Sequence, residues 1–300
     1  MTSELDPDVK NFTDTTDPRV ASGSGQMLHT LTRGCEDSVM AVEVETIRSK
    51  RKLLCAVMHD IAGSFPERTA NTPLSFIHKT VLRPGESFAF RKYAIYAELF
   101  TEDDKKNAVR KLTECRDRGF ETLKEEQKNF LSDFWSHSRV TVTDDEELQA
   151  QLDLSLYGML SSAGTDGRSN VAAKGLSGEG YEGHYFWDSE IYVFPFFLFS
   201  EPKTAKALLT YRYRHLSDAK AHARRMGHRV GALYPWRTIT GSECSSHYPT
   251  GSAQYHINGD IARAFAGYYD ATGDTGFLPE ICEVLVETAR LWMDAGHWLD

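Results

Sequence analysis

The hydrophobic period changes once along this chain, near Thr101, and that change limits the folds it can adopt. Between Ser38 and Phe100 apolar residues recur at every second position, as in SVMAVEVETI. This is the period of a strand with one buried face. Beyond Thr101 they recur three or four positions apart, as in an amphipathic helix. The sequence therefore predicts a mixed fold in which a β region precedes an all-α region.

The change of period divides the chain into three predicted domains: a partial β domain over residues 1–100, a helical linker over 101–140 and a helical domain over 141–300. TEDD at Thr101 resembles a capping box, which starts a helix. The first 25 or so residues are rich in Asp, Thr, Ser and Gly and are expected to be mobile or to lie at an edge. Too few strands for a closed barrel are expected, so the β region forms part of a sheet or sandwich. The predicted strands are residues 38–47, 53–59, 75–82 and 88–100.

Composition excludes several kinds of partner. A formal charge of -9 argues against nucleic acid or an anionic membrane, since both require a dominant basic surface. The apolar run from Ile191 to Phe199 is too short to cross a bilayer and the N-terminus has no apolar leader, so we expect a cytoplasmic protein. The five cysteines are scattered without C-x-x-C, which indicates neither a disulfide framework nor a zinc site.

Two long segments, residues 162–187 and 227–252, separate the predicted helices and are rich in Gly and aromatic residues. Loops of this length in a compact domain are usually functional. The first contains Gly178, Gly180 and Gly183 in the spacing G-x-G-x-x-G, which binds dinucleotides only between a strand and a helix. Its aromatic and acidic residues suit sugar binding better, because rings pack on the C–H faces of a sugar while carboxylates bind its hydroxyls. A buried aromatic helix start is the alternative.

The remaining candidate groups are histidines and carboxylates. His256 and Asp260, and likewise His184 and Asp188, lie four residues apart, but neither pair has a third ligand at a matching spacing, so no metal site is predicted. No G-x-S-x-G motif indicates acyl transfer. Glycoside cleavage commonly uses two carboxylates, and spacing alone selects no pair among those in or beside the loops: Glu179, Glu182, Asp188, Glu190 and Glu243.

Several segments resemble, in order, the start of the catalytic domain of glycoside hydrolase family 65. They are AAKGLSGEGYEGHYFWDSEIYVFPFFLFSEP, LLTYRYRHLSDAKAHAR, GALYPWRTITGSECS and QYHINGDIARAF. The resemblance covers residues 130–300, and residues 38–100 more loosely resemble the end of the family's N-terminal β-sandwich. It implies the C-terminal part of a β-sandwich, a helical linker and the first half of an (α/α) six-hairpin toroid barrel.

The family consists mostly of inverting phosphorylases of maltose, trehalose, kojibiose or nigerose. The resemblance implies that Trp187 stacks on the transferred glucose and that Asp188 accepts its hydroxyls. It places Tyr234, Trp236 and His256 at the same mouth, with core packing the alternative for Trp236 and His256. YPWRTITGSECS favours a kojibiose or nigerose enzyme. A homodimer is a family expectation.

The implied mechanism uses inorganic phosphate as co-substrate and no cofactor. Phosphate attacks the anomeric carbon while one protonated Glu donates to the leaving oxygen, giving β-glucose 1-phosphate. The family's Gly-Pro-Asp-Glu-Tyr-like acid motif does not occur in these residues, so no catalytic residue is assigned and the chain alone is expected to be inactive. A hydrolase using water and a noncatalytic sugar-binding fragment are the alternatives. The last helix, which still needs partners, is expected to expose Leu285, Leu291, Trp292 and Trp298.

Overall fold

The computed structural model describes residues 2–11, 25–61, 74–176, 178, 180–245 and 249–296. These residues form two compact units. The sheet unit contains residues 2–11 and 25–132, and the helical unit contains residues 133–296.

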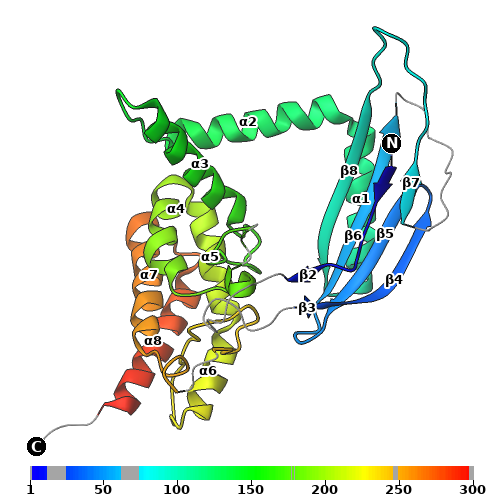
Figure 1. Cartoon of the computed structure of the whole chain (residues 1–300). Coiled ribbons are helices and arrows are strands. Elements are labelled where there is room, and N and C mark those ends of the chain that lie inside the picture. The colour runs from blue at the N-terminus through cyan, green and yellow to red at the C-terminus, as the bar shows by residue number, and fades with distance from the viewer. Residues whose placement is uncertain are drawn as a thin grey trace, which may run out of the picture. The chain divides into compact units, whose positions relative to one another are not determined.

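A four-stranded antiparallel sheet dominates the sheet unit, in the order β4-β5-β6-β8 (Figure 1). Two further pairs, β1 with β7 and β2 with β3, are short and antiparallel. The strands of the sheet are β4 (Leu28–Glu36), β5 (Val39–Thr46), β6 (Lys52–Ile61) and β8 (Phe90–Leu99), and the shorter ones are β1 (Thr2–Glu4), β2 (Lys10–Asn11), β3 (Gly25–Gln26) and β7 (Ser75–Ile77).

Strand β6 is buried on both of its faces, which explains its nearly continuous apolar sequence LLCAVMH. On one face Leu54 and Met58 pack against Leu112 of helix α1 (Glu102–Arg118). On the other face Val57 packs with Phe76 of β7. Side chains alternate across a strand, so one strand contributes to two apolar clusters.

Residues 101–140, predicted to form a helical linker, contain two helices, α1 and α2 (Phe120–Ser138), separated at Gly119. Gly119 has a φ of 82°, a conformation that favours glycine and ends α1. The backbone N–H of Thr101 donates to Oδ2 of Asp104 at 2.7 Å, so the predicted capping box is confirmed.

The helical unit contains α3 (Glu146–Ser162), α4 (Phe194–Ser200), α5 (Pro202–Arg214), α6 (Leu216–Arg225), α7 (His256–Thr272) and α8 (Leu278–Ala295). Helices α4 and α5 contact each other, as do α5 and α7, and α7 and α8 (Figure 1). Their apolar stripes meet in one core, whose fully buried members include Phe197, Leu209, Ile257, Ile261, Phe265 and Val284. Ile257, Ile261 and Phe265 lie on a helical face that the period of the sequence predicts.

The structure confirms the order of strands followed by helices and corrects several details. Strand β4 was not predicted, because LHTLTRGCE lacks a clear apolar alternation. The strand expected over residues 75–82 ends at Ile77, and the exposed residues that follow, Val81 among them, bury no face. Leu291, expected to be exposed, is fully buried against Ala223 and Leu233. Trp298 lies outside the described residues.

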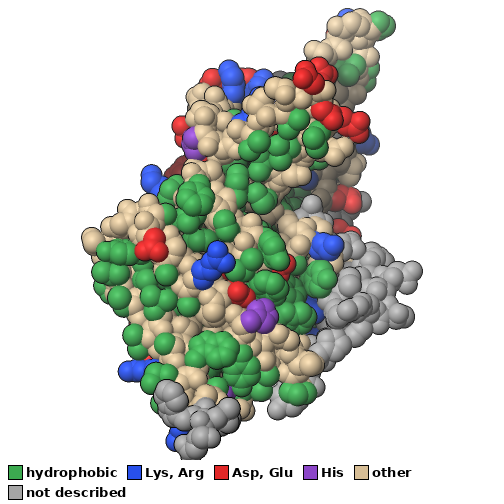
Figure 2. Space-filling view, turned by 90° about the vertical axis from the view of Figure 1, so that its left-hand side faces the viewer, with side chains coloured by type: hydrophobic (Ala, Val, Ile, Leu, Met, Phe, Trp, Pro, Cys, Tyr) green, Lys and Arg blue, Asp and Glu red, His purple; other side chains and the backbone are tan. Residues whose placement is uncertain are grey.

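Hydrophobic side chains gather on one face of the helical unit in Figure 2. Exposed large hydrophobic residues of this unit include Tyr192, Phe199, Val286, Trp292 and Met293. In the part of the chain that the structure describes, no helix has both the length and the apolar character needed to cross a membrane.

Candidate functional site

The two long loops predicted to be functional meet in the helical unit. The backbone N–H of Tyr185 donates to the carbonyl of Thr238 at 2.8 Å, and the N–H of Thr238 donates back at 3.1 Å. This isolated antiparallel bridge joins the segment before α4 to the segment before α7. Backbone hydrogen bonds therefore join residues about fifty positions apart in sequence.

The side chain of Arg237, which is only 3% exposed, joins the same two loops. One terminal nitrogen donates to Oε2 of Glu182 at 3.1 Å and lies 3.4 Å from the carbonyl oxygen of Tyr181. Tyr181 and Glu182 have φ values of 61° and 53°, which cost free energy in residues other than glycine. Burial, and then the charge of Arg237, lower the pKa of His184, which favours a neutral ring. Arg237 thus holds a strained turn in place.

The G-x-G-x-x-G spacing lies in this strained turn and lacks the setting of a dinucleotide site. The described residues directly before Gly178, from Asn170 to Leu176, form no strand, and Gly180–Gly183 is a single 3-10 turn. A Cβ at Gly178 would lie 2.4 Å from the carbonyl oxygen of Lys174, so this glycine permits close backbone packing. The glycines shape the loop.

A buried ion pair anchors the residues that follow. Nε of Arg212 in α5 donates to Oε1 of Glu190 at 2.8 Å, and a terminal nitrogen donates to Oε2 at 2.7 Å. The same nitrogen donates to the carbonyl of Phe186 at 2.9 Å. Burial lowers the pKa of Arg212, but the charge and hydrogen bonds of Glu190, together with Tyr211 and Tyr234, hold that pKa above its ordinary value. Glu190, a candidate catalytic carboxylate, is therefore fixed as a structural counterion.

Trp187 and Asp188 lie between these two anchored residues, directly before a turn of π-helix at Ser189–Val193. Such turns are rare and often occur at functional sites. Trp187 is half-buried, and its ring meets His256 edge-on with centroids 4.9 Å apart. The Asp188 side chain is exposed and makes no capping hydrogen bond.

His256 begins α7, and its Nδ1 lies 2.8 Å from Oδ2 of Asp260. This contact fixes the orientation of the His256 ring. It also explains why His256 and Asp260 lie four residues apart, so that spacing does not require a metal ion. Within the described ranges, no group of three or more His, Cys, Asp or Glu side chains is arranged to hold a metal ion. His184 is engaged with Tyr181 and Arg237, apart from Asp188.

Trp236 is half-buried, and its ring meets Phe186 edge-on at 5.2 Å. Its backbone N–H donates to Oε2 of Glu243 at 2.6 Å, and that of Ser245 donates to Oε1. Burial raises the pKa of Glu243, although these backbone hydrogen bonds oppose the rise. Glu243 therefore closes its own loop and has both oxygens occupied.

Tyr234 is placed elsewhere than the resemblance implied. It is 1% exposed, and its hydroxyl donates to the carbonyl of Arg212 at 3.3 Å. Its backbone N–H donates to Oδ1 of Asn258 at 3.0 Å. A ring held inside the core by two helices cannot line a surface in this structure, so Tyr234 positions the loop that carries Trp236.

The structure brings the rings of Trp187 and His256 into contact, and Asp188 follows Trp187 in the chain. Trp236 packs on Phe186, which precedes Trp187. Glu179 lies outside the described residues. Sequence reasoning missed Arg212 and Arg237, whose burial no local pattern reveals. The one available signal was indirect: Glu182 and Glu190 are acidic residues within an apolar, aromatic segment, and buried acids require basic partners.

Two family models match this chain. Residues 1–134 match the model described as glycosyl hydrolase family 65, N-terminal domain. Residues 153–300 match the one described as the glycosyl hydrolase family 65 central catalytic domain.

Characterised relatives match over different lengths. An α,α-trehalose phosphorylase from Geobacillus stearothermophilus is 42% identical over 99% of this chain and 39% of its own length. A kojibiose phosphorylase from Escherichia coli is 36% identical over 62% of this chain and 27% of its own length. The chain thus spans well under half the length of these relatives.

A solved structure shares the fold. A putative kojibiose phosphorylase from human microbiome superimposes with a TM-score of 0.85 over 99% of this chain and 39% of its own, at 22% sequence identity.

Proposed function

Because this chain belongs to glycoside hydrolase family 65, we propose that its helical unit forms the glucose-binding part of an inverting disaccharide phosphorylase. The helices would be the first half of an (α/α) six-hairpin barrel. The proposal concerns a longer protein, since the chain spans 39% of a full-length relative. A homodimer and a cytoplasmic location remain predictions.

The placement of Trp187 and Asp188 carries this proposal. The indole ring offers an apolar face for a sugar ring, and the neighbouring carboxylate has no side-chain hydrogen bond among the described residues. Glu182 and Glu190 are held by buried arginines. Asp188 is therefore the candidate carboxylate best able to accept sugar hydroxyls.

In the proposed reaction, a phosphate oxygen attacks the anomeric carbon from the face opposite the leaving sugar. The bond from that carbon to the bridging oxygen breaks, and the bridging oxygen takes a proton from a carboxylic acid. The products are β-glucose 1-phosphate and glucose. Glu182, Glu190 and Glu243 are all engaged in structural contacts. We therefore infer that they do not act as the acid, that Asp188 binds and positions the sugar, and that this chain alone does not catalyse the reaction.

We propose trehalose as the disaccharide. The trehalose phosphorylase is similar over nearly the whole chain, whereas the kojibiose phosphorylase is similar over a shorter part and at lower identity. This comparison outweighs the preference for kojibiose or nigerose that the segment YPWRTITGSECS suggested. Two glucose units linked through their anomeric carbons would place identical rings on both sides of the broken bond.

Calorimetric titration of the chain with glucose and trehalose tests the proposal. Trp187→Ala should weaken binding by about 1–3 kcal/mol, roughly 5- to 150-fold, through loss of an apolar wall. Asp188→Asn should also weaken it. Trp292→Ala, which removes a ring that is 46% exposed on α8, is the matched control and should leave binding unchanged. Equal effects of Trp187→Ala and Trp292→Ala, or no binding by the unmodified chain, would reject the proposed site.

Activity assays distinguish the remaining alternatives. The chain is incubated with trehalose, with and without phosphate, while glucose and β-glucose 1-phosphate are followed. Enzyme-like phosphorolysis would contradict the inference that these carboxylates do not act as the acid. Glucose release that is independent of phosphate would support a hydrolase. A chain that binds sugar without turnover supports the binding role proposed for its described residues.

A further inference from the structure

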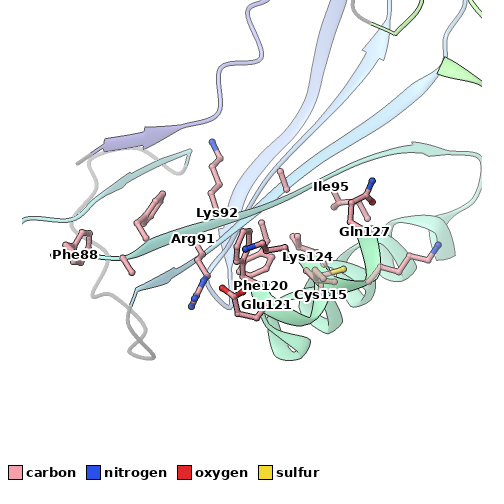
Figure 3. Close-up of a pocket in the computed structure, with 16 residues that line it drawn as sticks. Phe88, Arg91, Lys92, Ile95, Cys115, Phe120, Glu121, Lys124 and Gln127 are labelled. Carbon is pink, nitrogen blue, oxygen red and sulfur yellow. The ribbon is translucent and has the colours of Figure 1, made fainter. Parts of the chain in front are cut away.

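A cavity of about 1030 Å³ lies within the sheet unit, between strand β8 and helices α1 and α2 (Figure 3). Its walls are largely apolar, with Phe88, Phe90, Ile95, Leu112, Phe120 and Leu123 among them. The sugar-binding proposal does not use this cavity, because all of its residues lie between positions 88 and 127. We refer to it as the β8 groove.

The β8 groove runs along the edge of its strand. Every residue from Phe90 to Ile95 lines it, although successive side chains of a strand point to opposite faces. Arg91 and Lys92 extend to opposite sides of the strand in Figure 3. Only the backbone edge is common to all six positions. Among the described strands, β8 is last in its sheet and pairs with β6 alone, so its outer N–H and C=O groups are open to a further strand.

The charge of the β8 groove is opposite to that of the whole chain. Four basic side chains line it, Arg91, Lys92, Lys111 and Lys124, against one acidic side chain, Glu121. The whole chain has a formal charge of -9. Lys92, Lys111 and Lys124 form no ion pair with any other residue in the described ranges. These cations therefore favour an acidic occupant.

Tyr93 supplies a second sign of an incomplete site. It lines the β8 groove and is 8% exposed, and its hydroxyl has no hydrogen-bond partner among the described residues. Buried tyrosine hydroxyls usually find a partner. A polar atom of an occupant would provide one.

We propose that the β8 groove binds an extended, acidic segment of a partner polypeptide as an added strand. Backbone hydrogen bonds to β8 would provide the affinity, apolar side chains on one face would enter the groove, and acidic ones would meet its lysines. A second copy of this chain fits less well. Its copy of β8 would bring two basic residues, Arg91 and Lys92, and one acidic residue, Glu98, so it lacks the acidic excess that the groove favours. The other edge strand, β4, carries Arg33 and Glu36 and has no acidic excess.

The test uses the full chain and a fluorescein-labelled peptide of about eight residues, Thr-Glu-Val-Glu-Val-Glu-Val-Thr, with fluorescence anisotropy as the readout. The same peptide with lysine in place of glutamate should bind at least about tenfold more weakly. N-methylation of alternate amides removes the donors of one peptide edge. Methylation of the edge that faces β8 should abolish binding. Methylation of the opposite edge should have little effect on binding.

Two double variants locate the site. Lys111→Glu with Lys124→Glu reverses one charge on each helix inside the β8 groove and should weaken binding of the acidic peptide at least about tenfold, taking exposed pairs at up to ~1 kcal/mol each. Lys106→Glu with Lys128→Glu makes the same change on the same helices outside it and should alter binding by less than about twofold. Circular dichroism verifies that both variants are folded.

Four results would overturn the proposal. The acidic peptide does not bind, or it binds no more tightly than the basic peptide. N-methylation leaves the affinity of the peptide unchanged, whichever edge is methylated. The two double variants change the affinity of the acidic peptide equally. A fifth result would also overturn the proposal: a chain dimer, seen by sedimentation, that the acidic peptide dissociates would identify a second copy as the occupant.

Discussion

Replacing Glu190 with glutamine tests how the helical unit holds its binding loop. The change keeps the shape of the side chain but removes the counterion of Arg212, and both side chains are almost fully buried, with 1% and 2% of their surface exposed. Loss of one partner of a buried ion pair leaves an uncompensated charge and costs about 3–5 kcal/mol. An exposed pair would cost about 0–1 kcal/mol.

Urea unfolding followed by tryptophan fluorescence measures this cost in the relevant unit, because Trp135 is the first of the five tryptophans and none lies in residues 1–132. With a urea dependence of about 2 kcal/mol per molar, the midpoint should fall by roughly 1.5–2.5 M. Glu283→Gln is the matched control: Glu283 pairs with Lys220 at 3.1 Å in the same unit, but both side chains are about one-third to one-half exposed. It should shift the midpoint by less than about 0.5 M.

A double variant distinguishes the cost of leaving Arg212 without its counterion from the cost of altered packing. Replacing Glu190 and Arg212 together with methionine removes both charges, and it should recover much of the stability lost in Glu190→Gln. If Glu190→Gln costs no more than Glu283→Gln, the pair does not anchor the loop and the reasoning is refuted.

Two further predictions concern one residue in each unit. Burial and the charge of Lys92 lower the pKa of His59 from 6.5 to about 4. As the pH falls below about 6.5, the unfolded chain therefore binds a proton at His59 before the folded chain does. The free energy of unfolding should fall by up to about 3 kcal/mol as the pH drops towards 4. Thermal unfolding between pH 7.5 and 4.5 should show this slope, and His59→Gln should flatten it while exposed His29→Gln does not. Gly241 has a φ of 85°, and a Cβ there would lie 2.3 Å from Nδ1 of His215, so Gly241→Ala should cost roughly 1–3 kcal/mol in the same urea assay; an unchanged midpoint would mean that the loop relaxes freely.

Much of the fold could be predicted because it depends on local periodicity. Strands β5, β6 and β8 and helices α7 and α8 bury regular apolar patterns, and the sequence showed each of them. Helix α3 departs from its pattern, because only Leu156 is fully buried and Leu148 is 49% exposed. Strand β4 gave no such signal, because it lies at the edge of the sheet and most of its side chains are exposed or half-buried. An edge strand is held by backbone hydrogen bonds, which carry little sequence information.

The site was predictable only in part, for a related reason. The residues on its surface, Trp187 and Asp188, lie in a recognisable aromatic and acidic motif. The residues that orient them, Arg212 and Arg237, act over long sequence separations through charge, and their burial depends on the folded chain. Tyr234 shows the reverse case, since it lies in a motif yet faces the core.

These contacts imply that loop geometry and stability are coupled in the helical unit. The terminal nitrogen of Arg212 that binds Glu190 also binds the carbonyl of Phe186, and the Phe186 ring packs on Trp236. Trp187 lies between the two residues that Arg212 holds, so freeing either one allows its ring to move relative to His256. A buried charge is a costly way to hold a loop, and an apolar pair of similar volume is often no less stable. The ion pair adds a defined geometry. One planar guanidinium, that of Arg212, must donate to both carboxylate oxygens of Glu190 and to the carbonyl oxygen of Phe186. Only one arrangement of the residues around Trp187 satisfies all three contacts.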